Sequence, residues 1–117
     1  MPNYGAASPI GLFPGQQYAL FAAETPTAPQ SSQAVAVARP QSIGYDPVVF
    51  EIFFASAPTD SLVIQGAMAD VDARYQTLYT STNTQQDVYS DLGGFAFYRA
   101  RLVSQSGGGA VTVTVRH

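Results

Sequence analysis

The stretch FAFYRARLVSQSGGGAVTVTVR, residues 95–116, decides the fold class of this chain. Apolar and polar side chains alternate through both of its halves, which is the pattern of strands that bury one face. Three glycines, Gly107–Gly109, separate the halves and allow the backbone dihedrals of a tight turn. We therefore predict a hairpin of two strands, Phe95–Ser104 and Ala110–Arg116. The first strand groups Tyr98, Ala100 and Leu102 on one face, and the second turns Val111, Val113 and Val115 inward.

The rest of the chain, from residue 16 onward, continues this pattern of short strands separated by turn residues. The predicted strands are Gln16–Ala22, Gln33–Ala38, Val48–Ala55, Leu62–Met68 and Arg74–Thr80, followed by a polar segment at Gln85–Ser90 that holds Val88 and Tyr89. No segment has a convincing helical period. About eight strands of this kind indicate an all-β chain folded as an antiparallel β-sandwich. Both a jelly-roll and an immunoglobulin-like topology fit, because periodicity does not separate them.

The predicted strand Val48–Ala55 has two largely apolar faces. Val48, Phe50, Ile52 and Phe54 share one face, and Val49, Glu51 and Phe53 share the other. One face of an antiparallel sheet normally meets water. We therefore expect the second face to meet a partner or the folded-back N-terminal part of the chain.

The first 45 residues combine few charges with many aromatics and prolines. They contain two charged residues, Glu24 and Arg39, together with five aromatic residues and six prolines. A solvated linker lacks such aromatics, and a sheet interior does not accommodate so many prolines. We therefore predict an extended N-terminal arm over residues 1–30, which includes the strand at Gln16–Ala22, and a sandwich domain over residues 31–117. The arm is expected to lie on its own domain or, by preference, on a neighbouring subunit. The predicted subunit contacts are Tyr4, Phe13, Tyr18, Phe21, Arg99 and Arg101.

Composition narrows the class of function. Only 11% of the 117 residues are charged, 46% are hydrophobic, and the net charge is −3 without a single lysine. The chain has no basic stripe for phosphates, which argues against nucleic-acid binding. It also lacks cysteine, a secretory signal pattern and a stretch suited to a membrane-spanning helix. A low-charge, apolar surface favours a subunit of an assembly, and we expect a homo-oligomer, either a trimer or a dimer.

The sequence offers no constellation for catalysis. The sole histidine, His117, is the last residue, a position that is normally frayed and seldom has the rigidity that the imidazole of a Ser-His-Asp site requires. Asp70 and Asp72 are a weak candidate for a cation such as calcium, because the loop lacks further oxygen ligands and aspartates commonly form turns. The glycine triplet precedes a strand, so it is not a phosphate loop. We predict a protein that is not an enzyme and has no cofactor.

Aromatic and arginine side chains carry the remaining binding hypotheses. A platform for a sugar or a base could include Tyr75, Tyr79, Tyr89, Phe95, Phe97 and Tyr98. Alternating aromatics in strands are more often core residues or cross-strand pairs. Arg99 and Arg101 project from one face of the same strand. There they can pair with Glu51, Asp70 or Asp72 within the chain, or form an intersubunit salt bridge.

The block from Asp60 to Val115 resembles small β-sandwich virion proteins of tailed bacteriophages. The resemblance rests on the runs SLVIQGAMADVDARYQTLY and FAFYRARLVSQSGGGAVTVTV: an apolar strand ending near a glycine, an aspartate turn, an aromatic-x-x-Leu strand and a closing hairpin. The matching positions are Gly66, Asp70, Asp72, Tyr75, Leu78, Tyr98 and Arg101. The aspartate turn lacks a glycine of the family pattern, and tyrosine stands where tryptophan is common.

This resemblance implies a structural role in the virion. The expected role is that of a head decoration or cement protein at the capsid surface, made in the host cytoplasm and clamping the joints between major capsid subunits. A tail, neck or head-fibre component is a close alternative in the same class. A carbohydrate- or receptor-binding module that uses Tyr75 and Tyr79 is the alternative from a different class.

Overall fold

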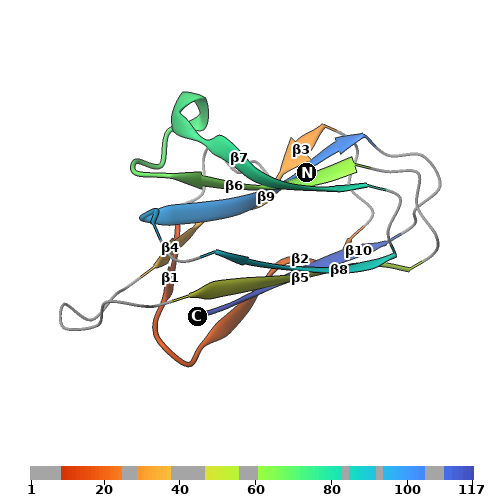
Figure 1. Ribbon diagram of the computed structural model, residues 1–117, viewed down its shortest axis with the longest axis horizontal. Helices are drawn as coiled ribbons and strands as arrows, with labels where there is room; N and C mark the ends of the chain where they lie inside the picture. The colour runs from red at the N-terminus through yellow and green to blue at the C-terminus, as the bar shows by residue number, and fades with distance from the viewer. Residues whose placement is uncertain are drawn as a thin grey trace.

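The computed structural model describes residues 9–24, 29–37, 47–55, 61–82, 85–91, 94–104 and 110–117. Within these residues the chain forms ten strands and one turn of 3-10 helix, η1, at Asp72–Arg74. The strands are β1 (Ile10–Leu12), β2 (Gln17–Glu24), β3 (Gln30–Ser31), β4 (Val35–Val37), β5 (Val48–Phe54), β6 (Ser61–Ala67), β7 (Gln76–Thr82), β8 (Gln86–Asp91), β9 (Phe97–Ser104) and β10 (Val111–Arg116). They make two layers that face each other (Figure 1), which confirms the predicted β-sandwich.

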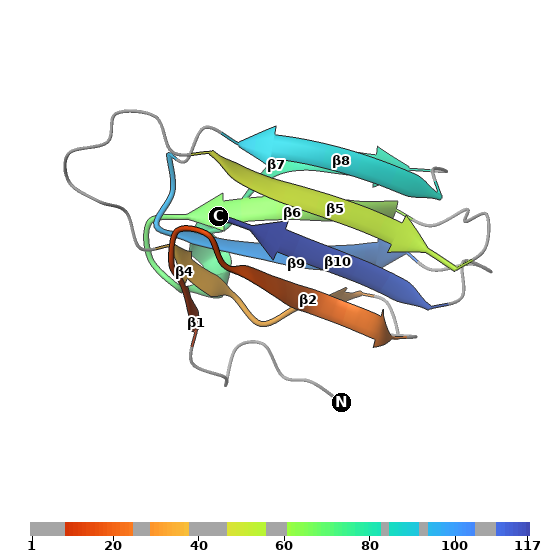
Figure 2. The same ribbon diagram turned by 90° about the horizontal axis from the view of Figure 1, so that it is seen from below.

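The order of the strands identifies the sandwich as a jelly roll. One sheet has the order β1-β4-β9-β6-β7, with β3 also paired to β9, and the other has the order β2-β10-β5-β8 (Figure 2). The antiparallel pairs are nested: β2 with β10, β3 and β4 with β9, β5 with β8, and β6 with β7. A long hairpin rolled into two layers produces this nesting, whereas an immunoglobulin sandwich groups its strands differently.

The predicted hairpin between the last two strands is wrong. β9 lies in the six-stranded sheet and β10 in the four-stranded sheet, so the connection between them crosses from one layer to the other. The alternation was interpreted correctly, since Tyr98, Ala100 and Leu102 face Val111, Val113 and Val115 across the core. The alternation of apolar and polar residues requires only that each strand bury one face. Two neighbouring strands of one sheet meet this requirement, and so do two strands that face each other from different sheets. The glycine triplet lies outside the described residues.

The core lies between the two sheets and contains the apolar face predicted for β5. Val48, Phe50, Ile52 and Phe54 are at most 1% exposed. β6 departs from simple alternation, because Leu62, Val63 and Ile64 are all buried. Met68, which was predicted in this strand, lies beyond its end and is 68% exposed. The strand is covered on both sides near its middle, and the chain turns away before Met68.

Stacked tyrosines close one open side of the sandwich. β7 and β8 are the edge strands there, and the rings of Tyr79 and Tyr89 stack with centroids 4.9 Å apart. Tyr89 also stacks on the buried ring of Phe50 at 6.2 Å. These rings join the two sheets where no backbone hydrogen bond can. The segment that was predicted only as polar, residues 85–90, forms the strand β8. Asp87, Tyr89 and Asp91 are on its inner face.

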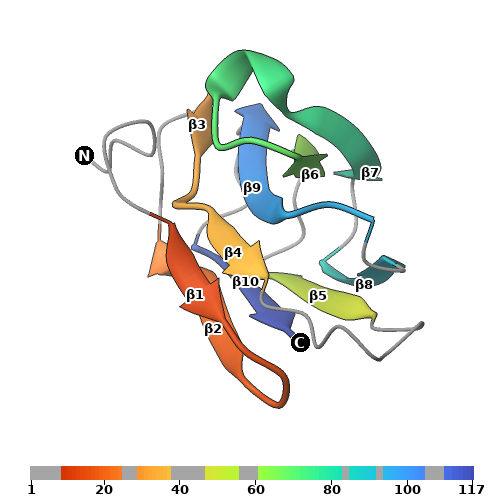
Figure 3. The same cartoon turned by 90° about the vertical axis from the view of Figure 1, so that its left-hand side faces the viewer.

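Two strands of the predicted arm are part of the sheets. β1 pairs in parallel with β4, and β2 pairs with β10 over nearly its whole length (Figure 3). Residues 1–8 and 25–28 lie outside the described residues. None of the described residues belongs to a helix long and apolar enough to cross a membrane.

Candidate functional site

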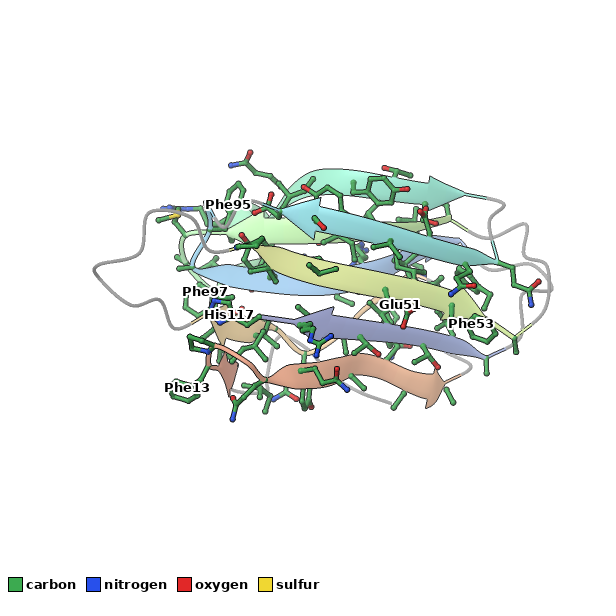
Figure 4. All side chains as sticks on the ribbon, turned by 60° about the horizontal axis from the view of Figure 1, so that its bottom comes forward. Phe13, Glu51, Phe53, Phe95, Phe97 and His117 are labelled. Carbon is green, nitrogen blue, oxygen red and sulfur yellow. The ribbon has the colours of Figure 1, made fainter. Side chains whose placement is uncertain are left out.

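The outward side of the four-stranded sheet is the candidate contact surface, called the outer face below. Register places eleven described residues on it: Gln17, Ala19, Val49, Glu51, Phe53, Gln86, Val88, Ser90, Thr112, Thr114 and Arg116. Figure 4 shows Glu51 and Phe53 on the side of β5 that faces away from the core. Strands form this surface because Val and Thr at alternate positions suit a pleated sheet on both of its sides.

The outer face is nearly free of charge and carries exposed apolar side chains. Among the eleven residues only Glu51 and Arg116 are charged, and their charges have opposite signs. Phe53 is 42% exposed and Val88 is 56% exposed. These two residues sit on neighbouring strands, since Glu51 pairs with Val88 and Phe53 pairs with Gln86. The face therefore has the composition of a contact surface rather than of a solvated one.

A shallow hollow of about 200 Å³ lies in the outer face. Its lining consists of Gln17, Val49, Glu51, Val88, Thr114 and Arg116. The lining combines the apolar side chains of Val49 and Val88 with one charge of each sign, on Glu51 and Arg116. It suits a protruding side chain of a partner, with hydrogen-bonding or ion-pairing groups beside it.

The predicted contacts in the arm have different environments. Phe13 is 57% exposed at the turn between β1 and β2, where a partner can reach it. Tyr18 is half-buried, and its hydroxyl donates a hydrogen bond to Gln33 Oε1 at 3.4 Å. Phe21 is 1% exposed and belongs to the core of its own chain, so its assignment as a subunit contact is wrong. Its burial follows from the pairing of β2 with β10, which turns this ring inward. Tyr4 lies outside the described residues.

Arg99 pairs with residues of its own chain, which is one of the two alternatives that the sequence left open. Its side chain forms an ion pair with Asp72 at 2.7 Å, and its Nε donates to Gln65 Oε1 at 2.8 Å. The guanidinium also lies 4.0 Å from the ring centroid of Tyr75. Only 4% of Arg99 is exposed, so it stabilises the six-stranded sheet and offers no surface to a partner. Arg101 donates to Ser31 Oγ at 2.8 Å and remains partly exposed.

Asp70 and Asp72 bind different partners within the chain. Asp70 Oδ1 accepts a hydrogen bond from the hydroxyl of Tyr75 at 2.7 Å, whereas Asp72 binds Arg99. A guanidinium beside a carboxylate disfavours a second cation there. Among the described residues no three acidic or histidine side chains form a metal-binding group. Asp70 lies in the bend after β6, where a turn was predicted, and Asp72 is the first residue of η1.

The tyrosines proposed as a sugar platform are hydrogen-bonded to aspartates of the same chain. The hydroxyl of Tyr79 donates to Asp87, and Asp91 accepts from both Tyr89 and Tyr98. The hydrogen bond to Asp87, ahead of burial, raises the pKa of Tyr79. Burial and the bond to Asp91 raise the pKa of Tyr89 to about 12. The hydroxyls of Tyr79 and Tyr89 therefore keep their protons to a higher pH than a free tyrosine and act as hydrogen-bond donors in the structure.

The rings of Tyr75 and Tyr79 also pack against other side chains of the chain. Tyr79 has one face on Tyr89, and Tyr75 has one face under the guanidinium of Arg99. Burial, ahead of the hydrogen bond to Asp70, raises the pKa of Tyr75. A sugar platform requires aromatic faces that are open to solvent. The geometry thus favours structural roles for Tyr75 and Tyr79.

His117 is not a frayed terminal residue, contrary to expectation. Its backbone N–H donates to Gln16 O at 2.9 Å, and its carbonyl accepts from Gly15 N–H at 3.0 Å. Its Nδ1 lies 3.1 Å from Leu12 O. Figure 4 shows His117 near Phe13 at one end of the sheet. The last residue therefore fixes the turn between β1 and β2.

The sequence did not predict Val88 as a contact residue of the outer face, and it predicted Phe53 only as part of a second apolar strand face. The two apolar faces of Val48–Phe54 were a sufficient signal for Phe53, because they predicted a second contact. Val88 lies beside Tyr89 in an otherwise polar segment, and no periodicity marked it as a surface contact. It becomes part of the surface only through the pairing of β8 with β5.

Comparison with known proteins identifies one fold neighbour of phage origin. No protein-family model and no curated protein sequence matches this chain. The crystal structure of the SPBc2 prophage-derived protein YomS superposes with a TM-score of 0.56, covering 86% of this chain and 90% of that chain. The sequence identity is 15%, so the similarity establishes a shared fold alone.

Proposed function

We propose that this chain is a non-enzymatic structural protein of a phage virion, which decorates the head and stabilises contacts between major capsid subunits. The observation that carries the proposal is the outer face: an ordered sheet surface with exposed Phe53 and Val88 and almost no charge. The phage origin of a protein with the same fold supports it, as does the resemblance of residues 60–115 to virion proteins.

The area of the outer face suits a protein that binds in many copies to a symmetric shell better than one that forms a single isolated interface. Four strands about 4.8 Å apart and six residues of about 3.3 Å give a footprint of about 400 Å². Standard interfaces bury about 800 Å² on each partner. A contact of half that area is weak alone, but a symmetric shell presents many copies and gains from avidity. The exposed Phe13 at the end of the same sheet adds to the footprint.

A reconstitution experiment tests this proposal. Particles of the phage that carries the gene are purified without this protein and mixed with the purified chain, and bound protein is quantified after sedimentation. Saturable binding to heads supports the decoration role. Binding to separated tails alone would assign the protein to the tail, neck or fibre class. Absence of binding to both, together with binding on a glycan array, would replace the proposal with the receptor-binding alternative.

A further inference from the structure

Phe13 is an exposed aromatic side chain at the turn between β1 and β2. It is 57% exposed, although Leu12, the residue before it, belongs to the core. None of residues 9–17 around it is charged. Figure 4 shows the ring pointing outward at one end of the four-stranded sheet. Aromatic side chains are enriched in the cores of protein interfaces, so this turn is a candidate anchor for a partner.

The backbone and the ring of Phe13 are held in a defined orientation. Phe13 N–H donates to Gln16 Oε1 at 3.1 Å, and Phe13 O accepts from Gln16 N–H at 3.0 Å. Pro14 fixes one backbone dihedral of the turn, and Gly15 has a φ of 84°, which suits glycine. The ring lies beside Gly11, where an added Cβ would be 3.5 Å from Phe13 Cε2. The turn therefore presents an ordered aromatic ring to solvent.

His117 ties this turn to the end of β10. Its backbone N–H donates to Gln16 O at 2.9 Å, and its carbonyl accepts from Gly15 N–H at 3.0 Å. Its side-chain Nδ1 lies 3.1 Å from Leu12 O. A carbonyl oxygen only accepts, so Nδ1 carries the proton in this hydrogen bond. The imidazole therefore holds the residue that directly precedes the exposed ring.

The turn is continuous with the outer face. Gln17 pairs with Arg116, and both residues line the hollow of that face. Their neighbours in the chain, Gln16 and His117, are the residues that hold the turn. A partner seated over the hollow therefore also reaches Phe13.

We propose that Phe13 anchors the contact by entering an apolar pocket of the capsid subunit, and that His117 is a positioning residue that holds the turn in place. This inference rests on the proposed function, because it takes the capsid subunit as the partner. The turn is ordered before docking, so docking does not lose the conformational entropy of ordering it. The ring supplies binding free energy by leaving water, and His117 acts through the position of the ring without touching the partner.

Binding of variants to particles that lack this protein tests the anchor. Phe13→Ala should raise the Kd about tenfold, because more than half of the ring is exposed before docking. The matched control is Met68→Ala, since Met68 is 68% exposed but follows β6 of the other sheet. It should bind as the unmodified chain does. A Kd for Phe13→Ala within about twofold of the unmodified value would overturn the proposal, and so would an equal loss in the control.

A double-mutant cycle tests whether His117 acts through Phe13. His117→Ala should raise the Kd about fivefold, because part of the order of the turn is then lost. His117→Asn should restore binding, since asparagine has an N–H donor for Leu12 O. In a chain that carries Phe13→Ala, His117→Ala should change the Kd by less than about twofold. Equal effects of His117→Ala in the two backgrounds would overturn the positioning role.

Amide hydrogen exchange of the free chain tests the positioning role without the particle. Exchange at Phe13 and Gly15 should be faster in His117→Ala and should return to the original rate in His117→Asn. Unchanged exchange would overturn this role. Exchange that rises equally in all strands would indicate a general loss of stability, and this result would overturn it as well.

The binding assay separates this proposal from the proposed function. An unmodified chain that does not bind heads contradicts the proposed function and removes the capsid subunit as the partner of Phe13. An unmodified chain that binds heads, with equal binding by Phe13→Ala, overturns the anchor alone.

Discussion

Replacing Phe53 and Val88 with threonine should weaken binding to the particle while the chain stays folded. The two side chains are 42% and 56% exposed on the outer face. Threonine is β-branched and suits an exposed strand position, so neither change should unfold the sandwich. The double variant removes the largest apolar surface from the face without adding a charge.

The size of the effect follows from the exposed fractions. Full burial contributes about 3 kcal/mol for phenylalanine and about 2 kcal/mol for valine. Multiplied by the exposed fractions of 42% and 56%, these values give roughly 2.4 kcal/mol on docking. Threonine keeps one methyl group, so the expected loss is about 2 kcal/mol, or about thirty-fold in Kd.

Sedimentation with particles that lack the protein measures this Kd, and circular dichroism confirms that each variant is folded. The matched control is Val103→Thr, because Val103 is 45% exposed on the outward side of the six-stranded sheet. It should bind as the unmodified chain does. A folded double variant that binds within about threefold of the unmodified chain would refute the reasoning, and so would an equal loss in the control.

Three further predictions concern stability and are checked by urea or thermal unfolding. Gly66→Ala should cost about 1–3 kcal/mol, because its Cβ would lie 2.8 Å from the ring of Phe95; an unchanged midpoint would contradict this close packing. Arg99→Met should cost about 2 kcal/mol by removing the partner of Asp72 and of the half-buried Gln65 amide, whereas Asp72→Asn, at a 65% exposed side chain, should cost under about 1 kcal/mol. Equal costs would be inconsistent with the geometry. Folding raises the pKa of Tyr89 from 10.0 to about 12, so the folded state keeps this proton to a higher pH than the unfolded state does. The contribution of Tyr89 to the free energy of unfolding is therefore fully present below pH 10 and is lost as the pH rises through 12. Tyr89→Phe should reduce this alkaline loss, and an identical pH profile would argue against the assignment.

Alternation in the sequence was sufficient to predict which faces of the strands are buried. In β5, β9 and β10 every second residue points to the core, because a sheet with one buried face requires it. The same pattern says nothing about which strand lies beside which. The connection from β9 to β10 therefore appeared as a hairpin, although it crosses between the sheets.

The contact residues were harder to predict, because exposure depends on pairing between distant strands. Phe21 occurs in a proline-rich stretch of low charge, which suggested a surface arm, but pairing with Val113 turns its ring into the core. Val88 joins Glu51 only after β8 has paired with β5. The pairing of Arg99 with Asp72 was foreseen as one of two alternatives, and its geometry selects that one.

A cryo-electron microscopy reconstruction of purified virions of the encoding phage tests the central claim most directly. The account predicts density for this jelly roll repeated over the head lattice, with the outer face of Phe53 and Val88 against the capsid subunits. The account would be contradicted by a virion that lacks the chain, or by a bound chain whose four-stranded sheet faces solvent.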